Sequence, residues 1–293
     1  MTPTKPLSQG EFIAPIAALF ATIAISIDAM LPAMPEIAAT LSPDAPNRAQ
    51  LVVTSFVFGM GLGTLIAGPL SDAFGRKIII LLGSALYVVA AIACYFAKTL
   101  DFLLIARVVQ GFGAAAPRVV STAMVRDLFS GREMARVMSF VMMVFTLVPA
   151  VAPLMGQAVI YAAGWHAIFL VYVVFSIIIL LWMGLRQPET LAVADRRPLS
   201  VAALWAATKE VFSSRVVLVS IIAQSLTLAA LFATLSSMQG IFEQRFDRAT
   251  SFPSWFALIA MVSMGGSIIN AKVVIRLGMR KVVTRTYAGV VVL

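Results

Sequence analysis

The chain has 293 residues, of which 61% are hydrophobic and only 12% are charged, and its mean hydropathy is +0.98. A water-soluble domain of this length would need far more polar surface, so the composition excludes a soluble protein and indicates a chain that folds in lipid. The net charge of +9 fits cytoplasmic loops rich in Lys and Arg, and we expect no nucleic-acid partner.

Continuous apolar runs, separated by charges, Gly and Pro, predict an all-α polytopic membrane protein. Several runs approach 20 residues, about the length with which a helix crosses a hydrocarbon core of roughly 30 Å. A further run, from Val282 to Leu293, is too short to span. The expected helices cover 12–35, 49–70, 78–97, 101–125, 134–160, 165–186, 213–240 and 252–275.

The first run contains a carboxylate, Asp28, in the segment IAISIDAMLPAMPEI. At 1.5 Å per residue, Asp28 lies about 10 Å from the outer end of its helix, and Arg107 lies about 8 Å below the same surface in the helix 101–125. Charges inside a bilayer are costly, so they usually face a cavity and carry function. Two interpretations stay open: a proton-binding carboxylate with Arg107 as its candidate partner, or a structural pair of snorkelling charges.

The segment GPLSDAFGRK, residues 68–77, follows the second run and is the most specific local motif. Gly68 and Gly75 can supply unusual backbone dihedrals, and Asp72 can cap a helix or pair with a cation. Arg76 and Lys77 can anchor the turn on the cytoplasmic side. These residue types alone predict a tight structural loop.

The distribution of Lys and Arg predicts the topology. Of the 22 such residues, 17 fall at the N-terminus and in the loops after every second run, four fall on the other side, and Arg107 lies within a run. This bias predicts a cytoplasmic N-terminus. The polar stretch 187–212 is expected to be a central cytoplasmic linker between a six-helix bundle, residues 1–186, and an incomplete second bundle, residues 213–293.

An internal repeat supports two related bundles, because residues 63–80 align with residues 266–283 at a constant offset. The second bundle would then hold two helices and part of a third, so we expect a C-terminally truncated transporter that lacks about three helices. A fragment without transport activity of its own is the alternative. One cysteine, one histidine and no recognisable catalytic motif lead us to expect neither a metal site nor an enzyme.

Three motifs resemble those of a known family. GPLSDAFGRK resembles the loop pattern G-x-L-[SA]-D-x-x-G-[RK]-[RK] of the major facilitator superfamily. LIARVVQGFGAAAPRVV resembles the R-x-x-Q-G motif of its proton-coupled antiporters, with Arg107, Gln110 and Gly111 at the key positions. VRDLFSGREMARVMS, together with DAMLPAMP and VPAVAPLMGQ, resembles the bicyclomycin-resistance (Bcr/CflA) branch of drug:proton antiporters.

The resemblance implies the major facilitator fold, with a complete six-helix N-terminal bundle and two to three helices of the C-terminal bundle. It implies a monomeric transporter in a bacterial-type inner membrane, with small-molecule substrates, protons and membrane lipid as partners. Proton-coupled efflux by alternating access would need no cofactor, and export of a specific metabolite is the alternative. The implied site residues are Asp28, Arg107 and Gln110 for proton and substrate binding, Gly68, Asp72, Gly75, Arg76, Lys77 and Arg126 for a gating loop, and Pro149, Pro153 and Gly156 for a bend in the helix 134–160.

Overall fold

The computed structural model describes residues 9–246, 251–262, 273 and 279–292. Within these ranges the regular structure is entirely helical, which confirms the all-α expectation. Seven of the described helical stretches are long and apolar enough to cross a bilayer. The predicted helix 252–275 is described only as a helix over Phe252–Val262 and at residue 273, and most of the repeat partner 266–283 lies outside the described residues.

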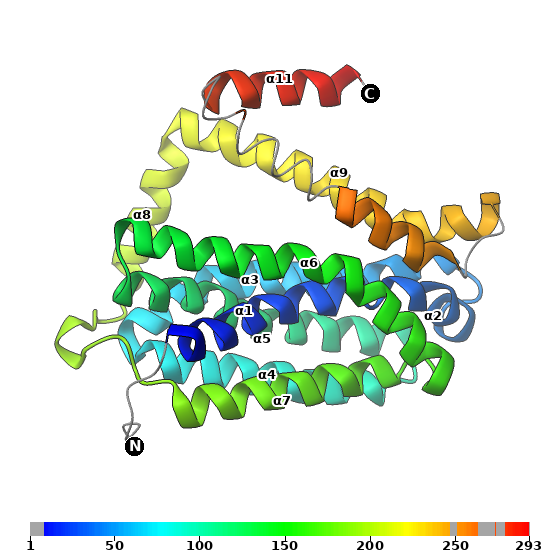
Figure 1. The fold of residues 1–293 in the computed structure, drawn as a ribbon, viewed down its shortest axis with the longest axis horizontal. Coiled ribbons are helices and arrows are strands. Elements are labelled where there is room, and N and C mark those ends of the chain that lie inside the picture. The colour runs from blue at the N-terminus through cyan, green and yellow to red at the C-terminus, as the bar shows by residue number, and fades with distance from the viewer. Residues whose placement is uncertain (1–8, 247–250, 263–272, 274–278, 293) are drawn as a thin grey trace.

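The first six predicted spans form one bundle of helices that run side by side (Figure 1). Glu11, Gly75, Leu128 and Arg186 lie at one end of it, called here the linker end, and Tyr95 and Trp165 lie at the opposite end. The bundle's elements are α1 Gln9–Asp28, η1 Leu31–Ala33, α2 Met34–Leu41, η2 Pro46–Gln50, α3 Leu51–Phe74, α4 Arg76–Tyr95, α5 Leu100–Leu128, α6 Gly131–Ala163 and α7 Ala167–Arg186.

The predicted helix 12–35 is broken. Helix α1 ends at Asp28, and the chain continues through the 3-10 turn η1 into α2. Pro32 and Pro35 stand in the first positions of η1 and α2, where a missing amide hydrogen is tolerated. Each of the two prolines removes a backbone donor, and the run folds here as two helices joined by a 3-10 turn.

Helix α5 is the central element, and glycines let it approach its neighbours closely. A Cβ at Gly111 would clash with the carbonyl of Phe56 on α3, and a Cβ at Gly59 would clash with the carbonyl of Val108. Such small-residue contacts replace the hydrophobic effect as the source of helix association in lipid. The close approach of α3 and α5 encloses the side chain of Arg107, which is 0% exposed.

The part of the chain after α7 is also helical. Helix α8, Val201–Ser213, occupies half of the stretch expected to be a linker, and η3, Val193–Asp195, lies before it. Helix α9, Arg215–Phe246, extends further than the predicted span 213–240, and α11, Met279–Val292, is a short terminal helix. Helix α9 contacts η1 at the opposite end of the bundle and diverges from the bundle towards the linker end (Figure 1).

Candidate functional site

Asp28 occupies the last position of α1, and its side chain is buried, with 6% of the residue exposed. The break that follows rearranges the backbone hydrogen bonds at this helix end. The Met30 amide donates to the Ile27 carbonyl at 3.3 Å, as in a 3-10 turn, and not to the Ser26 carbonyl four residues back. The Ser26 carbonyl therefore needs another donor, because no water is present in the bilayer core to satisfy it.

Arg107 on α5 supplies that donor. Its Nη2 donates to the Ser26 carbonyl at 3.0 Å, its Nε donates to the Val52 carbonyl at 3.0 Å, and its Nη1 donates to Gln110 Oε1 at 2.8 Å. The guanidinium also lies over the Phe56 ring, 4.4 Å from the ring centre. A cation at the carbonyl end of a helix interacts favourably with the helix dipole, so Arg107 caps α1.

Arg107, the candidate partner of Asp28, is bonded to other groups in this structure. In the described part of the chain the two side chains make no ion pair. The physical reason is that the three guanidinium nitrogens are each bonded to other acceptors, one of which lies two residues before Asp28. Asp28 and Arg107 were predicted to lie at similar depths in the membrane. Similar depth does not determine which acceptors the rigid, planar guanidinium of Arg107 binds.

Two tyrosines complete this polar cluster, which joins α1, α3, α4, α5 and α7. The hydroxyls of Tyr87 and Ser26 are hydrogen-bonded at 2.5 Å, and Tyr172 donates to the Ile25 carbonyl at 3.2 Å. Gln110 is held by Arg107 through its oxygen, whereas its buried Nε2 has no hydrogen-bond partner in the described structure. Ser26 and Tyr172 were not predicted as site residues, because single hydroxyls in apolar runs carry little sequence signal.

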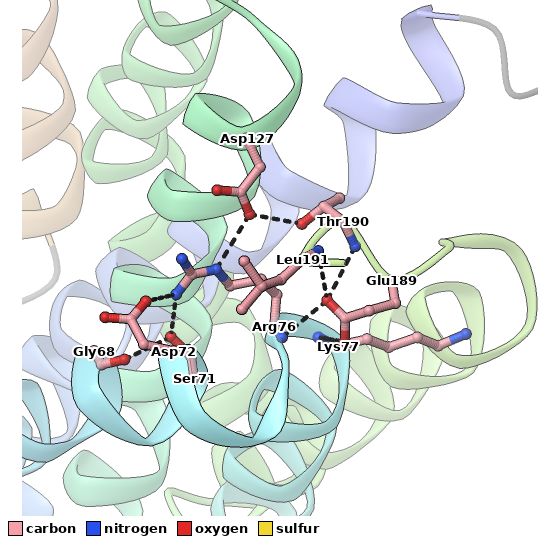
Figure 2. A network of polar contacts seen from close by, with 9 residues as sticks. All are labelled: Gly68, Ser71, Asp72, Arg76, Lys77, Asp127, Glu189, Thr190 and Leu191. Carbon is pink, nitrogen blue, oxygen red and sulfur yellow. Dashed lines mark hydrogen bonds and ion pairs between the residues drawn. The ribbon is translucent and has the colours of Figure 1, made fainter. Parts of the chain in front are cut away.

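The gating-loop motif forms a turn of a single residue. Gly75, with φ 108°, links α3 to α4, and a Cβ there would lie 2.6 Å from Glu189 Oε2. Gly68 and Asp72 do not belong to a loop, since α3 continues to Phe74. Gly68 therefore supplies no turn, and Asp72 does not cap a helix but pairs with Arg76 (Figure 2).

Arg76 is the centre of the polar network at the linker end, and its residue is 8% exposed (Figure 2). Its guanidinium bonds Asp72, donates to Ser71 Oγ at 2.7 Å, and donates through Nε to Asp127 at the end of α5 at 3.1 Å. Arg126, which was predicted to belong to the gating loop, is exposed and has no ion pair among the described residues. The next residue, Asp127, joins the network instead. Within the described residues, the contact of Lys77 with this network is that of its backbone amide.

Glu189, which sequence reasoning missed, caps α4 from more than 110 residues away. Its carboxylate accepts from the backbone amides of Arg76 at 2.9 Å and Lys77 at 3.1 Å, and also from Thr190 and Leu191 in its own segment (Figure 2). A carboxylate at the first amides of a helix satisfies unpaired donors and complements the helix dipole. The segment after α7 is thus fastened across the α3–α4 turn.

Helix α6 contains Pro149 and Pro153 and continues through both. Gly156, also in α6, faces the break after Asp28, where a Cβ would clash with the Ala29 carbonyl. The glycine therefore permits close contact between α6 and the interrupted helix, and the bend at the two prolines stays a prediction.

The comparisons with known proteins agree with this architecture. Over 179 residues, 60% of this chain, the sequence is 38% identical to the "Uncharacterized MFS-type transporter YdgK" of Bacillus subtilis (strain 168). Over 253 residues, 86% of this chain, it is 32% identical to the bicyclomycin resistance protein homolog of Haemophilus influenzae (strain ATCC 51907 / DSM 11121 / KW20 / Rd). The matches span 44% and 63% of the two relatives' lengths, respectively. The expected resemblance to the bicyclomycin-resistance branch is thereby confirmed.

A solved structure shows the same fold. The crystal structure of a D-xylose-proton symporter matches with a TM-score of 0.67 at 12% identity, covering 90% of this chain and 69% of that one. At this identity the likeness concerns the fold alone. The family model described as Major Facilitator Superfamily matches residues 16–293, which is most of the sequence. This membrane protein therefore belongs to the major facilitator superfamily of transporters.

Proposed function

We propose that the transporter exports small organic molecules in exchange for protons, by alternating access between two helical bundles. The observation that carries the proposal is Asp28, a buried carboxylate placed at the break between α1 and η1. The relative named as a bicyclomycin resistance protein homolog supports small drug-like molecules as the substrate class. The proton gradient would supply the energy, and no cofactor would be required.

Proton binding is the simplest chemistry for such a carboxylate. A charged group that is held away from water and has no ionic partner is costly, and a bound proton removes the charge. Asp28 has no ion pair in the described structure, whereas the nearby Arg107 is fixed by two carbonyls and Gln110. We assign to Asp28 the binding and release of the proton, and to Arg107 and Gln110 the support of the helix end that carries it.

The exchange follows if proton and substrate compete for one site. Arrival of a substrate near Asp28, above all a cationic one, would favour the charged carboxylate and release the proton. Access to Asp28 must then alternate between the two sides of the membrane, and rocking of the bundles around the interrupted helix provides such a movement. No covalent step is needed.

We also propose that the linker end faces the cytoplasm of a bacterial inner membrane. The charge bias supports this orientation, because Lys and Arg gather in loops that are not translocated. The contact of α9 with η1 and its divergence towards the linker end (Figure 1) support a form that opens to the cytoplasm. We expect the transporter to act as a monomer.

Transport in proteoliposomes tests the proton role. With a pH gradient imposed on the wild-type transporter, expressed from its natural reading frame, we expect accumulation of ethidium or bicyclomycin that collapses when a protonophore dissipates the gradient. Asp28→Asn should lose at least about tenfold of the gradient-driven rate, since 1.4 kcal/mol of lost coupling already gives that factor, whereas insertion and thermal stability should stay near wild type.

The matched control is Asp44→Asn, because Asp44 is an exposed carboxylate in the connection after α2. It should transport like the wild type. Gradient-driven transport in Asp28→Asn equal to that of Asp44→Asn would refute the proton role of Asp28, and loss of transport in both variants would show that the effect is not specific to the buried carboxylate.

A further inference from the structure

A small cavity in the interior of the bundle is lined by two serine hydroxyls that the proposed function does not use. Ser84 on α4 and Ser176 on α7 are 5% and 4% exposed, and neither Oγ has a hydrogen-bond partner in the described protein. Both residues line the same cavity, whose volume open to the centre of a water molecule is about 10 Å³. The cavity lies between α1, α4, α5 and α7, apart from the turn at Gly75.

Three other buried serine and threonine hydroxyls in the bundle bond to carbonyls of their own helices. Thr22 donates to the Ala18 carbonyl at 3.0 Å, Ser26 donates to the Thr22 carbonyl at 2.6 Å, and Ser121 donates to the Pro117 carbonyl. This back-bonding is the usual solution for a hydroxyl within a membrane helix. In the described structure Ser84 and Ser176 make no such bond, and both line one cavity.

We propose that this cavity binds one structural water molecule, which bridges Ser84 and Ser176. The volume suits a single water and no organic ligand, since about 10–15 Å³ by this measure holds one water. Thr22 also lines the cavity, and its hydroxyl oxygen retains lone pairs after donating to Ala18. The water accepts from one serine and donates to the other serine and to Thr22, which gives the three hydrogen bonds typical of buried water.

The bridge ties together helices that position the polar cluster around Asp28. Helix α1 carries Ser26 and ends at Asp28, and α7 carries Tyr172, which bonds the end of α1. A water held by α1, α4 and α7 would fasten these three helices to one another, so that the bundle moves as a rigid unit. This inference concerns the internal structure of the bundle and stands whether or not Asp28 binds a proton.

A structure of the wild-type transporter at a resolution that shows ordered waters tests the proposal directly. We expect a density peak within hydrogen-bond distance of both Ser84 Oγ and Ser176 Oγ. Rotation of the two hydroxyls onto the carbonyls of their own helices, with no peak between them, would overturn it.

A double-mutant cycle in the detergent-solubilised protein tests the energetic bridge. Ser84→Ala and Ser176→Ala should each lower the apparent melting temperature by about 2–4 °C, because each leaves the opposite hydroxyl buried without its bridge. The melting temperature of the double variant should be no lower than that of the less stable single variant, because the same water is lost in each case. Ser121→Ala, which removes a back-bonded hydroxyl, is the control and should change the melting temperature by under about 2 °C.

The sign of the effect discriminates between the alternatives. Removal of a hydroxyl that has no partner at all stabilises a protein or leaves it unchanged. Unchanged or raised melting temperatures in both single variants, or strictly additive losses in the double variant, would therefore exclude a bridging water.

Discussion

Arg107 stabilises the end of a broken helix in a place where water cannot. A lone guanidinium in a bilayer is expensive, and here it is balanced by the backbone carbonyls of Ser26 and Val52 and by Gln110. The same contacts fix the position of the α1 terminus and so of Asp28. The arginine is therefore a positioning residue for the carboxylate, although the two side chains form no ion pair.

Replacement of Arg107 by lysine tests this cap. The lysine ammonium keeps the charge, but it lacks the planar group with which arginine bonds acceptors on α1, α3 and α5 at the same time. We therefore expect two of the three hydrogen bonds to be lost. The variant should lose about 2–3 kcal/mol of stability, measured by thermal or denaturant unfolding in detergent. Arg118→Lys, an exposed site on the same helix, is the control and should stay within about 0.5 kcal/mol of wild type. Equal stability of the two variants would contradict the cap.

Charged site residues could be predicted from the sequence more readily than their partners. Asp28 and Arg107 are conspicuous because a charge interrupts an apolar run, and Gln110 follows three residues later on the same helix face. The structure places Gln110 on Arg107 as that spacing suggests. The carbonyl acceptors of Arg107 could not be predicted, because every residue carries a carbonyl and only the three-dimensional break leaves one unsatisfied.

Helix α4 shows how a remote segment defines the start of an element. Gly75 ends α3 with a positive φ, and α4 begins at the next residue without a side-chain cap from its own sequence. Glu189, beyond the end of α7, supplies the acceptor for the first two amides instead. The start of α4 and the path of the segment after α7 are thus held by one carboxylate.

Glu189→Gln should loosen the first turn of α4. The amide keeps the shape but removes the negative charge at the positive end of the helix, and we expect a loss of about 0.5–1 kcal/mol because the site is exposed. Hydrogen exchange, followed by mass spectrometry, should become about two- to fivefold faster at residues 76–79. Glu210→Gln on α8 is the matched exposed control and should leave these amides unchanged. Unaltered exchange in Glu189→Gln would exclude the cap.

The helices themselves were predictable, whereas their ends were not. Apolar runs of about 20 residues are sufficient to predict spans such as α4 and α7, since lipid demands them. The break after Asp28 was missed although Pro32 and Pro35 mark it, because the apolar run continues through both prolines. Helix α3 extends through the expected loop to Phe74, since helical hydrogen bonding continues past Pro69.

At the scale of the whole molecule, the two ends of the bundle differ in kind. The linker end holds the network of Arg76 with Asp72 and Asp127 and the cap by Glu189 (Figure 2). The opposite end holds an apolar core that includes η1 and also Phe252 and Phe256 from the later part of the chain. At the linker end, the polar groups can exchange their partners for water. At the opposite end, apolar packing joins the six-helix bundle to the later part of the chain.

Cysteine labelling tests the proposed orientation of these ends. The 293 residues contain one cysteine, Cys94, which is 0% exposed, so the protein without an introduced cysteine should react little with a membrane-impermeant maleimide and serves as the control. Asp44→Cys places an exposed thiol at the opposite end and Asp195→Cys places one at the linker end. In intact cells we expect at least about tenfold more labelling of Asp44→Cys, and labelling of Asp195→Cys only after permeabilisation, because positively charged loops stay in the cytoplasm. The reverse pattern would invert the topology and with it the proposed direction of transport.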